Sequence, residues 1–403
     1  MPCFEKTRLF CIVPVFVMAA CSGGEDDSSG GIDNTPLPPP PLPSVQTGVF
    51  KDLNVAGLAF VSGGESGITD NRGRFTCETG RDVAFSIGTA NLGSTACTTL
   101  VTPNQLATDG PNFDLELANL ARFLQMLDSD DEPDNGIVIS EAVQQIAASW
   151  APIDFLTSDL TTELSSVISD VASVDLRTPQ LPSEQDALAH LNATLDCAYA
   201  GAYAGSIAGS SSGAAGMVIG WQAPSFGFLP RAFEWQGFDA VNEVGVFGGG
   251  GPIEIRGLPI IDHTDPGVAG PISAQFVTAD SIAGTWEGGA LNLRRIGPAD
   301  DGSRFRLVGK AENFAFDAQV QAYMSLNLDG EAIAGEAFEV LEGTVFTVVG
   351  ELVGDNVVLT ATSGGQTLLG SGVMTRHPDG SPNEAQGTFD DGTSFSIVAC
   401  RLN

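Results

Sequence analysis

The clearest pattern in the chain is an alternation of apolar and polar residues between positions 316 and 329. The apolar positions are Phe316, Ala318, Val320, Ala322, Met324, Leu326 and Leu328. A period of two sends successive side chains to opposite faces of a β-strand. We therefore expect one long strand with a dry face and a wet face, the wet face including Tyr323, Ser325 and Asn327.

Apolar runs separated by turn signals continue through residues 198–403. The signals are Asp301-Gly302, Asp329-Gly330, Gly354-Asp355-Asn356 and Asp391-Gly392. Sequential hairpins give a meander, and closing the meander removes the exposed edges of its long strands. This region is predicted to be an antiparallel up-and-down β-barrel.

The period changes to that of a helix between residues 103 and 197. Apolar residues fall at helical spacing at Phe113, Leu117, Leu120, Ala121, Leu124 and Leu127. They predict an amphipathic helix over 112–127, and weaker signals predict helices over 140–150, 157–172 and 183–195. We expect a small helical unit here.

Residues 48–102 contain short strand-like runs at 55–61, 73–77 and 83–87, separated by glycine-containing turns. They indicate a small β-sandwich. The predicted fold class is therefore mainly β with a helical insert, consisting of the sandwich, the helical unit and the C-terminal barrel.

The N-terminus has the pattern of a secretory signal. Lys6 and Arg8 precede an apolar run that ends in Ala19-Ala20-Cys21. This run is too short for a stable membrane span, and small residues mark a cleavage site. The segment Met18-Ala19-Ala20-Cys21 resembles the lipobox of bacterial lipoproteins, although Met stands where Leu is usual. The resemblance implies removal of residues 1–20 and acylation of Cys21.

Residues 21–47 form a predicted tether rich in Gly, Ser and Pro. Proline favours the extended polyproline II conformation, so the tether would act as a spacer. Ser22 follows the cysteine that is expected to be acylated. An Asp at this position would resemble the inner-membrane retention signal of Gram-negative lipoproteins, and this chain does not have it. We therefore expect an outer-membrane location with lipid anchoring, and the sequence leaves open whether the protein faces the periplasm or the exterior.

Two modules resemble parts of bacterial surface lipoproteins. The turn Thr69-Asp70-Asn71-Arg72-Gly73 before Phe75 is similar to turns of carboxypeptidase-regulatory-like sandwiches. This resemblance implies a structural or adhesive module without catalytic residues. The barrel region resembles lipocalin-type and transferrin-binding-protein-type barrels in architecture.

Four cysteines remain after the signal and Cys21 are set aside, namely Cys77, Cys97, Cys197 and Cys400. In an oxidising envelope they suggest two disulfides, which could pair in three ways. Cys77 with Cys97 is favoured because both lie in the small β-unit. Cys197 and Cys400 would then join the first and last strands of the predicted barrel, which are neighbours in a closed meander.

The charge balance is strongly acidic, with 50 Asp and Glu against 17 Lys and Arg and a net charge of −33. Such a surface repels nucleic acid and attracts divalent cations or basic partners. We expect no nucleic-acid partner.

An acidic loop follows the first predicted helix. Asp128, Asp130, Glu132 and Asp134 alternate before Asn135-Gly136 and resemble the start of EF-hand and dockerin loops. The glycine comes two residues late, and the usual closing Glu is missing. A structural Ca²⁺ held by these four residues is one interpretation, and a solvated acidic loop is the other.

Other motifs favour ordinary structure over catalysis. Gly209-Ser210-Ser211-Ser212-Gly213 matches GxSxG but has strand-like flanks on both sides, whereas a nucleophile elbow leads into a helix. His190, His263 and His377 lack metal-ligand spacing and are expected to be surface or turn residues. We therefore expect no enzyme.

Aromatic residues cluster early in the barrel region and are expected mainly to fill its core, while Trp221, Phe228 and Trp235 are the first candidates for recognition. Taken together, the sequence predicts a non-catalytic binding, adhesive or envelope-structural lipoprotein, whose partner beyond the membrane is a protein or a small apolar ligand. The alternatives are a carrier of a small apolar molecule in the barrel and a hydrolase with an unrecognised site. A filled barrel interior favours protein binding, an apolar cavity favours a ligand, and convergent Asp, His and Ser favour an enzyme.

Overall fold

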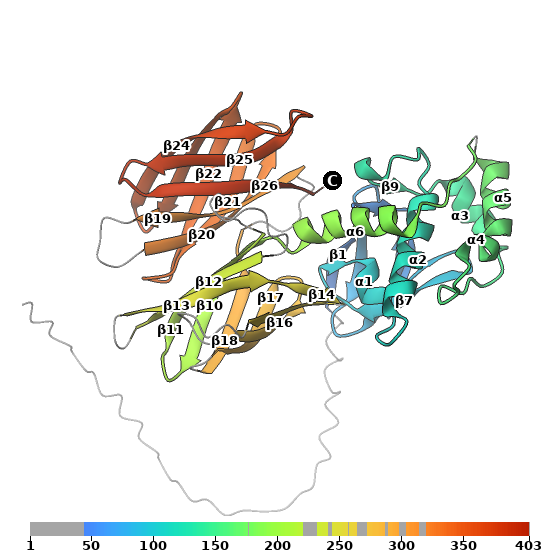
Figure 1. Ribbon diagram of the computed structural model, residues 1–403, viewed down its shortest axis with the longest axis horizontal. Helices are drawn as coiled ribbons and strands as arrows, with labels where there is room; N and C mark the ends of the chain where they lie inside the picture. Colours follow the sequence, from blue (N-terminus) through green and yellow to red (C-terminus); the bar gives the residue numbers. More distant parts are fainter. Residues whose placement is uncertain are drawn as a thin grey trace, which may run out of the picture. The chain divides into compact units, whose positions relative to one another are not determined.

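The computed structural model describes residues 44–175, 177–220, 232–240, 244–256, 258–263, 272–286, 289–297, 304–313 and 320–402 (Figure 1). All of them belong to one unit, residues 43–403. The predicted signal peptide, Cys21 and all but the end of the tether lie outside the described residues, as do Trp221 and Phe228.

The N-terminal strands form two small sheets. The strands are β1 (Val45–Phe50), β2 (Val55–Ala56), β3 (Ala59–Ser62), β4 (Glu65–Ile68), β5 (Arg74–Glu78), β6 (Asp82–Ile87), β7 (Ala90–Ala96) and β8 (Leu100–Val101). One sheet has the order β5-β1-β8 and the other β4-β3-β6-β7, while β2 pairs with a later strand. The rings of Phe50, Phe75 and Phe85 meet edge to face in the core that both sheets share, at centroid distances of 4.9 and 5.0 Å.

The predicted turn before Phe75 is also present. Asp70 accepts hydrogen bonds from the backbone amides of Arg72 and Arg74, both at 2.9 Å. Gly73 adopts a φ of 71°, which a residue with a Cβ rarely adopts.

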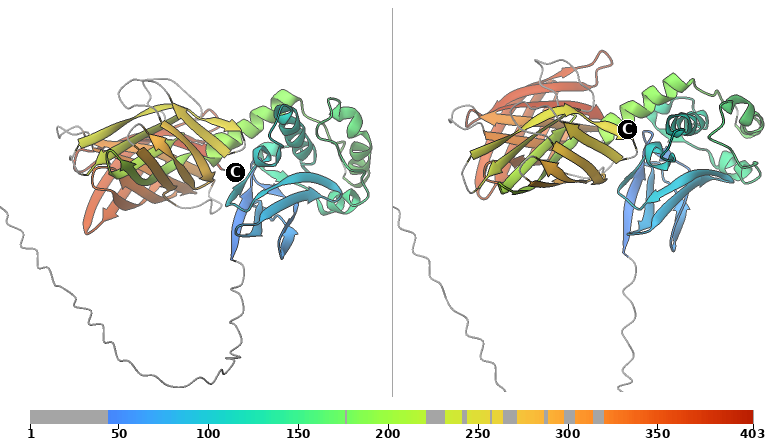
Figure 2. Two further views of the ribbon diagram at one scale, coloured as in Figure 1. Left: turned by 90° about the horizontal axis from the view of Figure 1, so that it is seen from below. Right: turned by 60° about the horizontal axis from the view of Figure 1, so that its bottom comes forward.

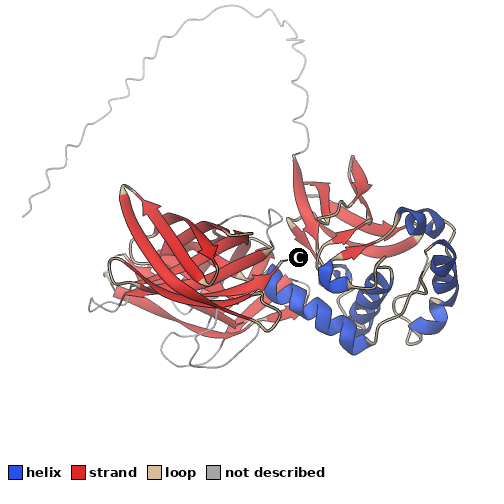
Figure 3. Ribbon diagram, turned by 90° about the horizontal axis from the view of Figure 1, so that it is seen from above, coloured by secondary structure: helices blue, strands red, loops and turns tan. Residues whose placement is uncertain are grey.

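The helical segment follows the predicted pattern with one break. The elements are α1 (Pro103–Leu106), α2 (Phe113–Met126), η1 (Pro133–Asn135), β9 (Ile137–Val138), α3 (Glu141–Ala147), α4 (Leu160–Glu163), α5 (Ser165–Val174) and α6 (Glu184–Ala198). Ser140 and Ser183 cap α3 and α6 by accepting from the amides of Val143 and Asp186. The expected helix over 157–172 is two helices. Figure 3 shows the helices, in blue, gathered beside the N-terminal strands.

The next strands form a nine-stranded antiparallel sheet. They are β10 (Gly201–Gly209), β11 (Gly213–Ile219), β12 (Ala232–Asp239), β13 (Val244–Pro252), β14 (Glu254–Arg256), β15 (Leu258–His263), β16 (Ile272–Thr278), β17 (Ser281–Trp286) and β18 (Gly289–Arg295). Their order is β13-β12-β11-β10-β18-β17-β16-β15-β14. The sequence pattern does not distinguish this sheet from the barrel that follows it.

The last eight strands close into an antiparallel barrel, which confirms the predicted fold class. They are β19 (Phe305–Asn313), β20 (Val320–Asp329), β21 (Ala332–Glu339), β22 (Thr344–Val353), β23 (Asn356–Ser363), β24 (Gln366–Arg376), β25 (Pro382–Phe389) and β26 (Ser394–Arg401). Closure comes from pairing of β19 with β26. The barrel therefore occupies 305–401 rather than the whole of 198–403, because β10 pairs with β18 instead of with β26 (Figure 2).

The expected wet face of β20 is largely covered, although Asp329 at the end of the strand is exposed. Tyr323, Ser325 and Asn327 are all buried. Tyr323 belongs to an apolar cluster that joins barrel residues such as Phe338 to Val218 of the nine-stranded sheet. Alternation correctly predicted the strand over 320–329, and the first four positions of the predicted strand, 316–319, lie outside the described residues. The pattern could not show that a second sheet covers the outer face.

Both predicted disulfides are present, with Cα–Cα distances of 5.7 Å for Cys77–Cys97 and 5.5 Å for Cys197–Cys400. The expected reason for the second pair is wrong, because the strand after Cys197 does not pair with β26. Cys197 instead lies in the last turn of α6, so the bond ties this helix end to the barrel.

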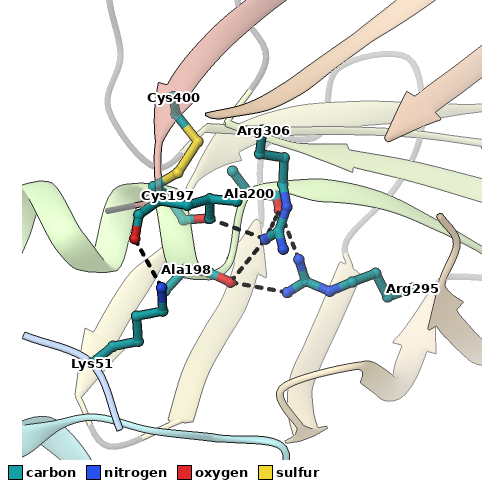
Figure 4. The surroundings of a disulfide bond; sticks show 8 residues. Lys51, Cys197, Ala198, Ala200, Arg295, Arg306 and Cys400 are labelled. Carbon is teal, nitrogen blue, oxygen red and sulfur yellow. Dashed lines mark hydrogen bonds between the residues drawn. A yellow bond between two sulfur atoms is a disulfide. The ribbon is translucent and has the colours of Figure 1, made fainter. Parts of the chain in front are cut away.

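The same helix end is surrounded by basic side chains (Figure 4). Arg306 donates to the carbonyl of Ala200 at 3.1 Å, and Arg295 donates to the carbonyls of Ala198 and Ala200 at 3.1 and 2.8 Å. Lys51 donates to the carbonyl of Leu402 at 2.8 Å. Cations at a helix C-terminus satisfy its free carbonyls and complement its dipole.

Candidate ligand site in the barrel mouth

Large apolar side chains fill the middle of the barrel. Those that face inward and are buried include Leu307, Leu326, Leu359, Phe395 and Ile397. Glycine makes this packing possible, because a Cβ at Gly372 would lie 2.8 Å from Cζ of Phe395. These buried side chains occupy the barrel interior between its two mouths.

One mouth is hollow instead. A cavity of about 310 Å³ lies where β19, β21, β23 and β25 end and the other four strands begin. Its apolar walls include Ala311, Ala322, Met324, Ala337, Phe346, Val348, Ala361, Leu368 and Phe389. Alanine stands at four of these inward positions, so the space comes from small side chains next to aromatic ones. This volume is at the lower end of the range for ligand pockets, which is about 300 to 1,000 Å³.

The rim of this cavity is polar and acidic. It carries Glu339, Glu342 and Asp391, and no Lys, Arg or His occurs among the described residues that line the cavity. Glu339 accepts hydrogen bonds from the amides of Leu341 and Glu342, at 2.7 and 2.8 Å. These bonds fix its carboxylate at the turn between β21 and β22. Burial raises the pKa of Glu339 in spite of the two hydrogen bonds, which lower it.

The opposite wall of the rim is also ordered by hydrogen bonds. Asp391 accepts from the backbone amide and from the hydroxyl of Thr393, both at 2.9 Å. Asn313 donates to the same hydroxyl at 3.1 Å. Polar groups held in this way are preorganised to orient a ligand.

The other mouth of the barrel has a hollow of about 510 Å³ with different chemistry. Arg376 lines it, and this side chain already donates to Asp355 at 2.7 Å and to the carbonyl of Gly380 at 2.8 Å. Asp379 accepts from the hydroxyl of Ser381 at 2.6 Å. Charged residues, namely Arg304, Glu331, Arg376 and Asp379, form a large part of the lining of this hollow, whereas the walls of the first mouth are mainly apolar, so we place the candidate site in the first mouth.

Two of the four predicted calcium ligands, Asp128 and Asp130, lie in contact with each other, but the four do not form one group among the described residues. Asp128 is buried and accepts from the amides of Val138 and Glu132, at 2.9 and 3.0 Å. Asp130 accepts from the side chain of Asn135, and Glu132 is exposed. Among the described residues, no group of three His, Cys, Asp or Glu side chains is placed to hold a metal ion. Calcium binding at this loop stays a prediction of the sequence.

Asp134, the fourth predicted ligand, contacts a histidine instead. His190 lies with Nδ1 3.1 Å from Asp134 and Nε2 3.4 Å from Oδ1 of Asp52. Gln125 donates to Oδ2 of Asp52 at 3.0 Å. The expectation that His190 is a surface residue is wrong, because its side chain is only 9% exposed. The network joins α6, α2 and the segment after β1.

Burial raises the pKa of Asp52 to about 6, against the opposing effect of His190. The pKa of Asp128 is also raised to about 6, mainly by burial. Perturbed carboxylates occur in active sites and also in structural networks. Asp52 has no exposed surface and bridges three elements, so we interpret it as structural.

The remaining candidates are explained by the fold. Trp235 is buried beside Trp286 in the core of the nine-stranded sheet, with ring centroids 6.2 Å apart, so its ring fills the core rather than a surface. The GxSxG run forms the turn between β10 and β11, as expected. The sequence of glycines at 248–251, which could suggest a connection between strands, lies within β13.

No helix in the described part of the chain has the length and apolar character needed to cross a membrane. Comparison with protein-family models, curated protein sequences and solved structures finds no match to this chain. The resemblances to surface lipoproteins therefore stay predictions from the sequence.

Proposed function

We propose that this chain is a non-catalytic binding protein that holds a small apolar molecule, or the apolar part of a larger one, in the mouth of its barrel. The observation that carries the proposal is the cavity of about 310 Å³ with apolar walls, set above a filled barrel core. Close packing of the protein's own core would require larger side chains than the four alanines that stand beside Phe346 and Phe389 at this end.

The cellular setting of the proposal comes from the sequence. Acylation of Cys21 would anchor the protein to the outer membrane, and the tether would separate the barrel from the lipid surface. The ligand would therefore be a molecule found in the envelope or outside the cell.

Blocking the cavity tests this proposal. Leu368 faces into the cavity from β24, whereas its neighbour Leu369 is 56% exposed on the outer face of the same strand. Replacing Leu368 by Trp should fill the space and weaken binding at least tenfold. Leu369→Trp adds the same side chain outside and should leave binding unchanged.

The probe is 2-phenylethanol, a neutral molecule with one ring, and its affinity is measured by saturation-transfer NMR. Circular dichroism of both variants shows whether the barrel folds. The proposal is wrong if folded wild-type protein does not bind the probe, or if Leu368→Trp and Leu369→Trp bind it equally well.

A further inference from the structure

The charges around the cavity have one sign. Three carboxylates, those of Glu339, Glu342 and Asp391, line it. None of the ion pairs formed within the described residues involves any of them. The mouth therefore presents negative charge that the described part of the protein leaves unneutralised, directly beside apolar walls.

Glu339 is the carboxylate best placed to act on a ligand. It is the last residue of β21 and is half-buried, and two backbone amides fix its orientation. The two amides neutralise only part of its charge. A positive group arriving from the cavity would interact with a carboxylate that is partly removed from water, where electrostatic interactions are stronger than at an open surface.

The aromatic walls favour the same kind of ligand. Phe346 and Phe389 line the cavity together with the alanines and Met324. Aromatic faces attract cations and also pack against apolar rings. An anionic ligand would meet three carboxylates here and a chain of net charge −33 overall.

We propose that the ligand is a small apolar molecule carrying one protonated amine, with its apolar part against Phe346, Phe389 and the alanines and its amine at the rim beside Glu339. This inference rests on the proposed function, because it names the class of ligand for the same cavity. The size of the cavity suits a single aromatic ring with a short side chain.

The test compares three probes that share one ring and differ in charge, namely 2-phenylethylamine, 2-phenylethanol and phenylacetate, at pH 7. We expect the amine to bind at least tenfold more tightly than the alcohol, and phenylacetate to bind more weakly than both. The preference for the amine should decrease as salt is added, because salt screens charges at an open rim.

Two variants and one control test whether the rim carboxylates cause the preference for the amine over the alcohol. Glu339→Gln should reduce amine affinity about five- to tenfold and change 2-phenylethanol affinity by a clearly smaller factor, because only the amine loses a charge interaction. Glu342→Gln should act in the same direction, and its exposed side chain makes no hydrogen bond that the fold of the turn requires. Glu351→Gln removes the same charge from the exposed outer face of β22 and should change neither affinity.

The outcomes separate the two proposals. Equal binding of the amine and the alcohol, or an amine preference unaffected by both rim variants, overturns the inference about charge and leaves the proposed function standing. Failure of all three probes to bind the folded wild-type protein overturns the proposed function, and the inference with it.

Discussion

Asp52 shows how one buried carboxylate makes stability depend on pH. Its pKa is about 6 in the folded protein and 3.8 in its ordinary state. Between about pH 4 and 6 the folded state therefore binds more protons than the unfolded state, so the free energy of unfolding falls as the pH rises through this window. A shift of about two pH units corresponds to at most about 3 kcal/mol.

Replacing Asp52 by Asn should remove this contribution. The variant keeps an acceptor for the side chain of Gln125, so its stability relative to the wild type should increase from pH 4 to pH 7. Asp128 changes stability in the same direction and is present in both proteins, so the difference reports Asp52 alone. Urea denaturation at pH 4, 5, 6 and 7 measures it. Identical pH profiles for the two proteins would contradict the assignment.

The network around Asp52 also shows how much of a residue's surroundings can be predicted from the sequence. The helix over 183–195 could be predicted from its spacing, and His190 lies three residues after Ala187 and four before Thr194, both buried. That spacing is the signal that could have placed His190 at the edge of the buried face. Its partners Asp52 and Asp134 are 138 and 56 residues away, and no local pattern connects them.

Among the elements, β24 and β25 show that a glycine on one strand leaves room for an aromatic ring on its neighbour. A Cβ added at Gly370 would have the ring of Phe389 as its nearest neighbour, at 2.8 and 2.9 Å from Cε1 and Cδ1. Gly370→Ala should therefore destabilise the protein by about 1–3 kcal/mol, as is usual when extra volume enters a filled core. It should also weaken ligand binding, since Phe389 lines the cavity.

A second substitution provides the control. In a Phe389→Leu background, Gly370→Ala should be neutral or stabilising by up to about 1 kcal/mol, because alanine restricts the unfolded chain more than glycine does. A double-mutant cycle by chemical denaturation measures the coupling. Additive effects would show that the Phe389 ring does not determine the choice of glycine.

Strands and helices were largely predictable because their signals are local. Alternation predicted the region of β20, helical spacing predicted α2 and α6, and Asp70 with Gly73 predicted a turn. The division of 198–403 into two sheets was not predictable, since every hairpin in it looks alike. Only the pairing of β19 with β26 closes the barrel, and that pairing depends on contacts distant in sequence. The cavity forms where inward-facing alanines of different strands come together after the barrel closes, so local patterns could not predict it either.

For the whole molecule, the Cys197–Cys400 bond closes a sequence separation of 203 residues, against 20 for Cys77–Cys97. In the chain-entropy model the two cross-links stabilise by about 5 and about 3 kcal/mol. Replacing both Cys197 and Cys400 by Ala should therefore cost more than replacing Cys77 and Cys97. Urea denaturation of the two double variants makes the comparison, and an equal or smaller cost for the long loop would show that the helix end is held by its other contacts.

The proposed function requires that a ligand enters one end of the barrel, and methionine methyl groups report on this directly. Met324 lines the cavity, Met374 is buried in the interior near Arg376 at the other mouth, and Met217 lies in the core of the nine-stranded sheet. The most direct measurement is a titration of methyl-labelled protein with 2-phenylethanol, followed by NMR. We predict a saturable shift of the Met324 methyl signal with Met374 and Met217 unchanged; a silent Met324 signal, or an equal shift at Met374, would contradict a ligand site in this mouth.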